Sequence, residues 1–285
     1  MKEETIKNGK FTTYVREFKS LDEFEKYITN TPLNSTFQWK TLQSVSGSQK
    51  FTQTSSYEEA TQLFKEGWNK MANELTKSLK VKQQQVENAQ VQKVMFDIVG
   101  FQASVPRYLQ GIPTSMVNKK LVPAKQKVIT LNKDISYHAG VKTSEIVEAS
   151  VQVLHLIKKI EAQGIRVNLN LIWGTREDST KEVVKIRLKS ANERLNISKL
   201  AFPLVHPSML RRLAFRYLEV APTVTSGYSW GYGKPLDGVD FKRYCPNEYV
   251  LPRLFNGNVK ELGDLSAVCN LTDKVKLVDG KWKWE

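Results

Sequence analysis

Cysteine and histidine are scarce in this sequence. The 285 residues contain only Cys245 and Cys269, and histidine occurs three times. Two cysteines make neither a disulfide framework nor a zinc site, so we expect reduced thiols in an intracellular compartment. No apolar run reaches the length of about 18 residues that a transmembrane helix needs. No apolar stretch follows the charged N-terminus, so the sequence predicts neither a membrane span nor a secretory signal.

Acidic residues are outnumbered by basic ones. Lysine and arginine number 43 against 29 aspartates and glutamates, which leaves a formal net charge of +14. Up to Lys127 there are 19 basic and 12 acidic residues, and after it 24 and 17, so both parts carry the same excess. An evenly spread excess argues against a basic tail and favours attraction to polyanions. It is also compatible with a charge that serves solubility alone.

The short motifs of several enzyme classes are missing. The chain contains neither GxGxxG nor GxxxxGK[ST], which disfavours nucleotide binding by those loops. The nucleophile elbow GxSxG is absent as well. With so few histidines and cysteines, the residues give little support for an enzyme.

Two capping boxes mark helices in the first part of the chain. A strand is predicted over 11–18, and Ser20 with Glu23 begins a short helix after it. Ser56 with Glu59 begins a second helix, whose apolar spacing runs on to Leu75. The lysine- and proline-containing stretch 118–127 resembles a domain junction.

The clearest unit begins at Val128. A β-branched strand over 128–132 is followed by a polar loop, an apolar helix over 144–163, Gly164 and a strand over 165–173. This order predicts a βαβ unit and therefore parallel strands. Residues 182–189 alternate between polar and apolar, as a half-exposed or edge strand does. A helix over 208–220 and a terminal hairpin through Asp279 and Gly280 are also predicted.

The loop after the strand at Val128 is a candidate ligand site. Ligands of parallel α/β sheets bind beyond the carboxyl ends of the strands, and Asp134, Ser136 and His138 lie there. A carboxylate and a hydroxyl at alternate positions can both face one magnesium ion. The other interpretation is that Asp134 and Ser136 cap the turn.

This loop resembles the metal-ion-dependent adhesion motif of von Willebrand factor A-type domains, Asp-x-Ser-x-Ser. Asp134 and Ser136 match the motif, whereas His138 stands where the second serine belongs. The resemblance implies a degenerate magnesium site within a Rossmann-like fold. Over most of 57–235, the chain also resembles an uncharacterised family of tailed-bacteriophage proteins. The segments that carry this likeness are YEEATQLFKEGW, VPRYLQGIP, LAFPLVHPSMLRRLAFRYLE and GYGKP. It implies a setting in the host bacterial cytoplasm and no known activity.

Two groups of residues are candidate nucleic-acid contacts. Three arginines of the predicted helix over 208–220 can hold phosphates, and aromatic residues alternating near a lysine can stack on bases. The alternatives are a solvated helix face and a strand with half-buried rings. The candidates are Arg211, Arg212, Arg216, Tyr228, Trp230, Tyr232 and Lys234.

These observations predict an α/β protein. We expect an N-terminal α+β region over 1–122 and, over 123–285, a Rossmann-like von Willebrand factor A-type sheet sandwiched by helices. The expected function is a non-catalytic phage protein that binds nucleic acid, single-stranded DNA or RNA by preference, through a basic surface. The alternative is a protein–protein interaction module, either an assembly factor or an inhibitor of a host defence. A magnesium-dependent enzyme or ligand binder centred on Asp134 is the third hypothesis. No membrane contact is expected, and a homo-oligomer is compatible with the sequence.

Overall fold

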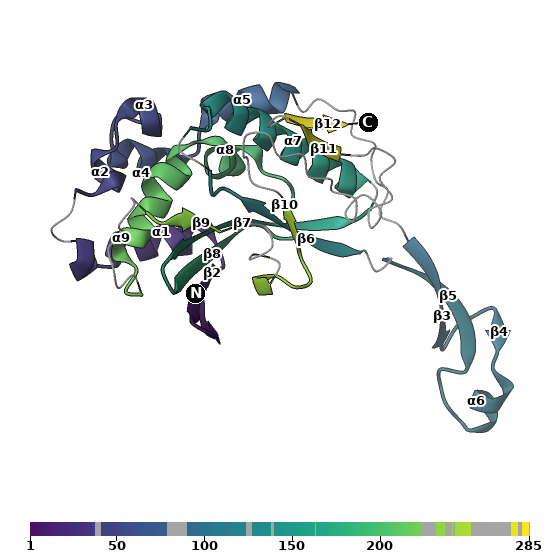
Figure 1. Cartoon of the computed structure of the whole chain (residues 1–285). Coiled ribbons are helices and arrows are strands. Elements are labelled where there is room, and N and C mark those ends of the chain that lie inside the picture. Colours follow the sequence, from purple (N-terminus) through teal and green to yellow (C-terminus); the bar gives the residue numbers. More distant parts are fainter. Residues whose placement is uncertain are drawn as a thin grey trace.

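A mixed β-sheet lies at the centre of the protein, and its strands come from both ends of the chain (Figure 1). The computed structural model describes residues 1–37, 41–78, 90–123, 127–137, 140–162, 164–223, 232–236, 241, 243–251, 275–278 and 281–284. The strand order is β1-β2-β8-β7-β6-β10, and β9 pairs with the end of β7. The strands are β1 (Lys2–Asn8), β2 (Phe11–Phe18), β6 (Val128–Asp134), β7 (Arg166–Glu177), β8 (Thr180–Lys189), β9 (Lys234–Pro235) and β10 (Tyr249–Leu251).

The predicted βαβ unit is confirmed. Strands β6 and β7 pair in parallel, with Leu131 opposite Leu169, and α7 (Thr143–Ala162) connects them. One side of α7 is fully buried through Ile146, Leu154 and Ile157. Strand β10 adds a third parallel strand beside β6. The fold is therefore α/β, as predicted, with a sheet that also contains antiparallel pairs.

Strand β2 pairs in parallel with β8 across the boundary expected between residues 122 and 123. A side-chain contact joins the same two strands. Arg16 of β2 donates from Nη1 to Glu182 of β8 at 3.1 Å, and both side chains are buried. Burial raises the pKa of Glu182, and the positive charge of Arg16 opposes that rise. The sheet and its core thus extend over both of the predicted regions.

Strand β8 was expected to be half-exposed or at an edge, but it lies inside the sheet. Its neighbours are β2 on one side and β7, in antiparallel pairing, on the other. The polar–apolar alternation has a different cause, because the two faces of the sheet differ. Val184 and Ile186 face the main core, whereas Lys185 and Arg187 lie on the opposite face, together with Val183 of a second, smaller apolar cluster.

Most of the described helices cover one face of the sheet. The buried side chains of α1, α4, α5, α7, α8, η2 and α9 all join a single apolar cluster with that face. On the opposite face, the helical turn that contains Phe241 packs on Ile172 and Val183, so helices flank the sheet, as predicted. The helices are α1 (Leu21–Asn30), η1 (Ser35–Phe37), α2 (Gln43–Ser46), α3 (Gln49–Thr52), α4 (Tyr57–Glu66), α5 (Asn69–Ser78), α6 (Val105–Leu109), α7, α8 (Ile197–Val205), the π-helix η2 (Met209–Ala214) and α9 (Phe215–Val220).

Both capping boxes form as predicted. The hydroxyls of Ser20 and Ser56 accept from the N–H groups of Glu23 and Glu59 at 3.1 Å. The helix expected to reach Leu75 is instead divided at Gly67, which has a φ of +87°. A Cβ at this position would lie 3.0 Å from the carbonyl oxygen of Ser198. Glycine thus ends α4 and lets the chain turn closely past α8 into α5.

A second, separate sheet projects from this body (Figure 1). Residues 90–123, here called the arm, form β3 (Gln90–Asp97), β4 (Gln102–Ala103), α6 and β5 (Met116–Pro123), in the strand order β3-β5-β4. Strand β5 occupies most of the stretch that was interpreted as a domain junction. The predicted terminal hairpin is present as β11 (Val275–Val278) and β12 (Lys281–Trp284); its turn residues lie outside the described residues.

His206 occupies the junction between α8 and η2. Its ring stacks on Phe202, with centroids 4.8 Å apart, and meets the edge of Trp68 at 4.7 Å. Its Nδ1 accepts from the N–H of Ser208 at 3.1 Å, so the ring stabilises the turn between the two helices. Burial lowers the pKa of His206 to about 4.

We predict that His206 makes the protein acid-sensitive. In the unfolded chain, histidine titrates near about 6.5, so below that pH the unfolded state binds a proton that the folded state does not. The stability is therefore complete above this pH and falls as the pH drops towards about 4, by about 3 kcal/mol at most. Urea unfolding at several pH values should show a smaller acid loss for His206→Gln. Equal losses would assign the acid sensitivity to other groups.

Candidate functional site

Asp134 and Ser136 lie together at the end of β6, as predicted, but they close their own turn. The N–H of Ser136 donates to Oδ1 of Asp134 at 2.8 Å, and the N–H of Gly174 donates to Oγ of Ser136 at 3.3 Å. Both side chains are buried. No group of three histidine, cysteine or acidic side chains gathers anywhere in the described residues, and His138 lies outside them. Asp134 and Ser136 therefore have the turn-capping arrangement, which was the other interpretation of this loop.

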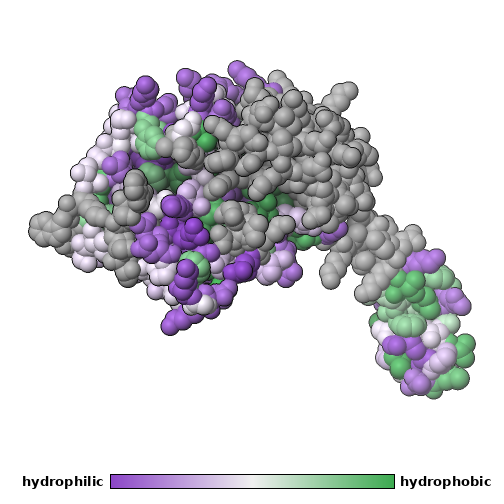
Figure 2. Space-filling model, in the orientation of Figure 1, coloured by the Kyte–Doolittle hydropathy of each residue, from purple (hydrophilic) through white to green (hydrophobic). Residues whose placement is uncertain are grey.

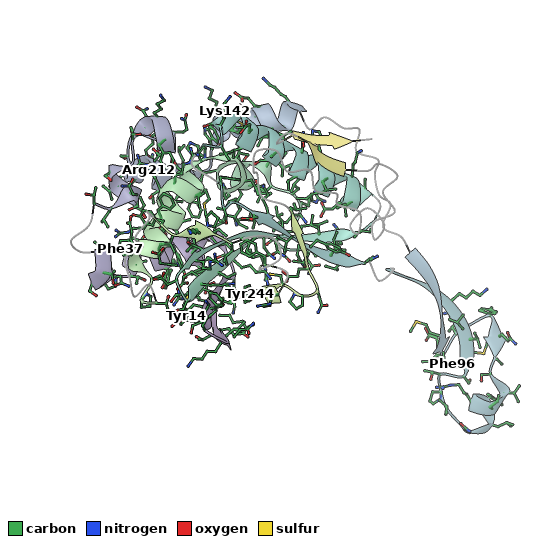
Figure 3. All side chains as sticks on the ribbon, in the orientation of Figure 1. Tyr14, Phe37, Phe96, Lys142, Arg212 and Tyr244 are labelled. Atoms are coloured by element: carbon green, nitrogen blue, oxygen red, sulfur yellow. The ribbon has the colours of Figure 1, made fainter. Side chains whose placement is uncertain are left out.

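Arg211 and Arg212 are buried, so the prediction that they contact phosphates is wrong in this structure. The guanidinium of Arg212, fully buried in the body (Figure 3), donates to the carbonyl oxygens of Ser44 at 2.8 Å, Gly47 at 3.1 Å and Thr54 at 2.9 Å. Arg211 donates to Phe51 O at 2.7 Å. Both arginines therefore hold the main chain around α2 and α3.

The other predicted contacts do not form one surface. Tyr232 stacks on Phe215 at 4.3 Å, accepts from the N–H of Gln43 at 2.9 Å and donates to Glu219. Burial and the charge of Glu219 raise its pKa. Arg216 is mostly buried and lies 3.7 Å from Glu219. Lys234 is exposed, whereas Tyr228 and Trp230 lie outside the described residues.

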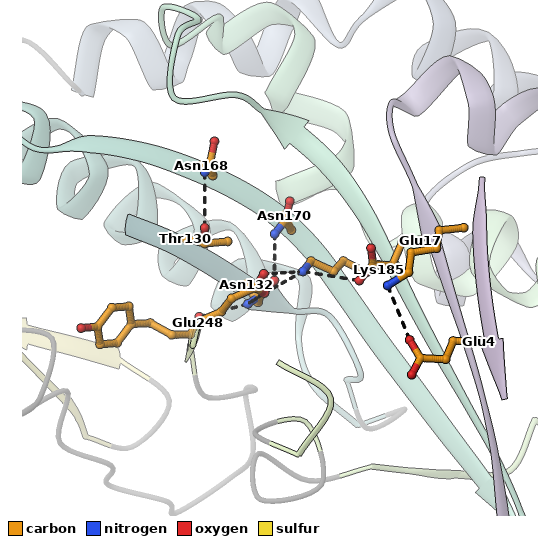
Figure 4. A network of polar contacts seen from close by, with 10 residues as sticks. Glu4, Glu17, Thr130, Asn132, Asn168, Asn170, Lys185 and Glu248 are labelled. Atoms are coloured by element: carbon orange, nitrogen blue, oxygen red, sulfur yellow. Dashed lines mark hydrogen bonds and ion pairs between the residues drawn. The ribbon is translucent and has the colours of Figure 1, made fainter. Parts of the chain in front are cut away.

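The face of the sheet opposite the main helix layer carries a row of polar side chains (Figure 4). Asn168 donates to the hydroxyl of Thr130 at 3.3 Å, and Asn170 donates to Asn132 at 3.0 Å, so polar side chains pair across β6 and β7. Asn132 in turn donates to Glu248 at 2.8 Å. These side chains satisfy one another's hydrogen-bonding groups. The network explains why polar residues occur within otherwise apolar strands.

Lys185 extends this row to β8 and the segment before β10. Its Nζ lies 2.7 Å from Glu248 and 3.8 Å from Glu17 (Figure 4). The positive charge of Lys185 and the hydrogen bond from Asn132 lower the pKa of Glu248 against the effect of its partial burial. The carboxylate is thus committed to joining β10 to the sheet.

The arm presents apolar side chains to solvent (Figure 2). Leu109 is 78% exposed and Val99 is 73% exposed. Of the twelve large apolar residues that are exposed in the described chain, nine lie in the arm: Val94, Met95, Phe96, Ile98, Val99, Phe101, Val105, Tyr108 and Leu109. Scattered exposed apolar residues are ordinary, whereas a contiguous group marks an interaction surface.

The arm has almost no core of its own. Within 94–119, where exposure is described, only Ser115 is buried. Its shape is held by local contacts instead. Arg107 donates from Nε to the carbonyl oxygen of Thr114 at 3.0 Å and lies 4.3 Å above the ring of Phe96 (Figure 3). A Cβ at Gly100 would come within 2.1 Å of the Val117 carbonyl oxygen, so only glycine fits that turn.

Together, these features define an α/β protein with a helix-covered mixed sheet and a projecting β-arm. The family described as a domain of unknown function, DUF7192, matches residues 2–276, and the chain belongs to that family. Comparisons with curated proteins and with solved structures gave no match. Within the described residues, no helix is both long enough and apolar enough to cross a bilayer.

The sequence-based selection of site residues missed the arm. Residues 94–101, VMFDIVGF, are rich in apolar residues, and a dense apolar strand is normally buried. The available signal was the run of apolar residues next to VPRYLQGIP, in a stretch with no helix pattern to cover it. That signal indicates a sheet whose apolar side chains are not buried by another element. The arm is therefore the candidate interface of this protein.

We predict that Arg212→Met lowers the free energy of unfolding by about 3 kcal/mol, because several buried carbonyl groups lose their donor. The matched control is Arg187→Met on β8, where the arginine is exposed and the expected loss is within about 0.5 kcal/mol. Urea titrations of the two variants measure the difference. Equal losses would contradict the structural role of Arg212.

We also predict that the arm exchanges its amide hydrogens far faster than the body. Exchange over 94–97 should exceed that over 169–172 by about 100-fold or more, because few buried contacts hold the arm closed. Hydrogen–deuterium exchange with mass spectrometry of the isolated protein measures both segments. Similar protection would show that the arm is already covered in solution.

Proposed function

We propose that this protein is a protein–protein interaction module whose arm docks onto a partner. The observation that carries the proposal is the exposure of nine large apolar side chains on a projection in which one described residue is buried. Small sheets need a covering element to be stable. A partner protein supplies that cover and buries the apolar group in the same step.

The composition of the arm favours a protein over a nucleic acid as this partner. Six of its nine exposed apolar residues are aliphatic or methionine, and these side chains gain by entering an apolar protein surface. Nucleic-acid binding by stacking needs aromatic faces along a basic groove. In addition, the burial of Arg211 and Arg212 removes two of the cations expected to form such a groove.

The proposed setting is the cytoplasm of a bacterium infected by a tailed phage, with the protein acting as an assembly factor or as an inhibitor of a host defence. The support is the resemblance of the segments between residues 57 and 235 to phage proteins. We also propose a distant relation to von Willebrand factor A-type domains. Its support is the parallel β6–α7–β7 unit, with Asp134 and Ser136 directly after β6.

Nucleic-acid binding is the second candidate function. The net charge of +14 favours it, and so do two cation–ring pairs in the arm. Arg107 lies 4.3 Å above the ring of Phe96, and Lys119 lies 5.2 Å above that of Phe101. Such pairs can stack on unpaired bases. Binding of this kind would weaken steeply with salt, because counterions are released.

Co-purification from infected cells after nuclease treatment tests the proposed function. The test variant is Val105→Glu combined with Leu109→Glu, which places two charges on exposed positions of α6. We expect the retained partner protein to fall by about tenfold or more, because the charges would have to be desolvated at the interface.

The matched control is Val45→Glu, which changes a 53% exposed valine on the body. It should retain the partner at the wild-type level, and all variants should melt at similar temperatures. Loss of every partner on nuclease treatment, with salt-dependent mobility shifts of single-stranded DNA or RNA, would favour the second candidate. Equal retention by the arm variant and the control would refute docking through the arm.

A further inference from the structure

The outer edge of β3 has no strand beside it in the described residues. The arm sheet has the order β3-β5-β4, so β3 pairs with β5 on one side only, over all eight of its residues. Strand β4 occupies just two positions on the other side of β5. A strand at an edge presents a row of main-chain donors and acceptors that another chain can use.

The hydrogen bonds of β5 show which residues of β3 offer these groups. The carbonyl oxygen of Val117 accepts from the N–H of Phe101 at 2.9 Å, on the β4 side of β5. Val117 therefore directs its main-chain groups away from β3, and Phe96, directly opposite, directs its own away from β5. Because this pattern has a period of two, Val94 does the same. The N–H and C=O groups of Val94 and Phe96 thus point outward from the sheet.

The edge strands β1 and β3 differ in how they are protected. Strand β1, at the edge of the main sheet, has the sequence KEETIKN, with two lysines and two glutamates. Charged residues of this kind discourage edge pairing. Strand β3 has the sequence QVQKVMFD, and its residues 94–96 are an apolar run. The arm therefore lacks, over these residues, the protection that the body has.

The charge of the arm indicates what pairs with this edge. Its basic residues are Lys93, Arg107, Lys119 and Lys120, and Asp97 is its acidic residue. Arg107 lies directly above Phe96, on the strand whose edge is open. A second copy of the arm would bring like charges together, and the whole chain carries +14. An acidic partner is attracted instead, and its carboxylates can pair with Arg107 and its neighbours.

We propose that the edge of β3 accepts an extended segment of a partner protein as a fourth strand of the arm, and that this segment alternates apolar and acidic residues. This inference rests on the proposed function and adds the mode of binding to it. The outward groups of Val94 and Phe96 bond to the main chain of the segment. Its carboxylates lie on the face of Phe96, where Arg107 lies above the ring, and its apolar side chains lie on the opposite face, beside the exposed Met95.

Val94→Pro tests the strand addition. Proline at this position removes an outward N–H and leaves the bonds between β3 and β5 intact, and it is tolerated at sheet edges. Val94→Thr is the control, because it keeps the N–H at the same 60% exposed position. A displayed library of random peptides is selected on the whole protein. We expect enriched peptides to alternate apolar and acidic residues, and to bind Val94→Pro about tenfold more weakly than Val94→Thr.

Three results would overturn the proposal. They are the absence of enriched peptides, equal binding to Val94→Pro and Val94→Thr, and protection of the Val94 and Phe96 amides by single-stranded DNA or by dimer formation instead of by peptide. Its failure is separable from that of the proposed function. If Val105→Glu with Leu109→Glu abolishes partner retention while Val94→Pro does not, docking by the arm stands and strand addition falls.

Discussion

The parallel pairing of β2 with β8 is the contact on which the rest of this structure depends. It joins the first strands of the chain to the βαβ unit in one sheet, and it places α1 on the same face as α7 and α8. The buried contact between Arg16 and Glu182 spans the same two strands, and the hydroxyl of Tyr217 joins it. Removal of Arg16 would deprive the buried carboxylate of Glu182 of this opposite charge, so the pair favours the meeting of these two strands.

Local patterns in the sequence predicted local structure well. The capping boxes at Ser20 and Ser56 and the βαβ unit from Val128 could be read because their determinants lie within a few turns of chain. The interior position of β8 could not be predicted, since it depends on β2, which is distant in sequence. A polar–apolar alternation is the same whether a strand lies at an edge or in a sheet with one polar face.

The candidate site was also hard to predict, because its contacts join residues that are distant in the sequence. An arginine on a helix is usually solvated, and nothing near Arg212 in the sequence indicates that carbonyl groups from residues 44–54 surround it. Conversely, VMFDIVGF has the composition of a buried strand, and its exposure follows from the absence of a covering element around the described arm. Burial is a property of the assembled chain and cannot be predicted from local composition. Arg212 was therefore expected to be exposed and is buried, whereas the apolar residues of VMFDIVGF have the composition of a buried strand and are mostly exposed.

The arm starts and finishes at neighbouring positions, because Gln90 at the start of β3 pairs with Pro123 at the end of β5. Segments whose ends meet can be lengthened, shortened or replaced without a change in the path of the chain on either side. A change in length or sequence that is confined to residues 90–123 therefore leaves the residues that stabilise the helix-covered sheet as they are.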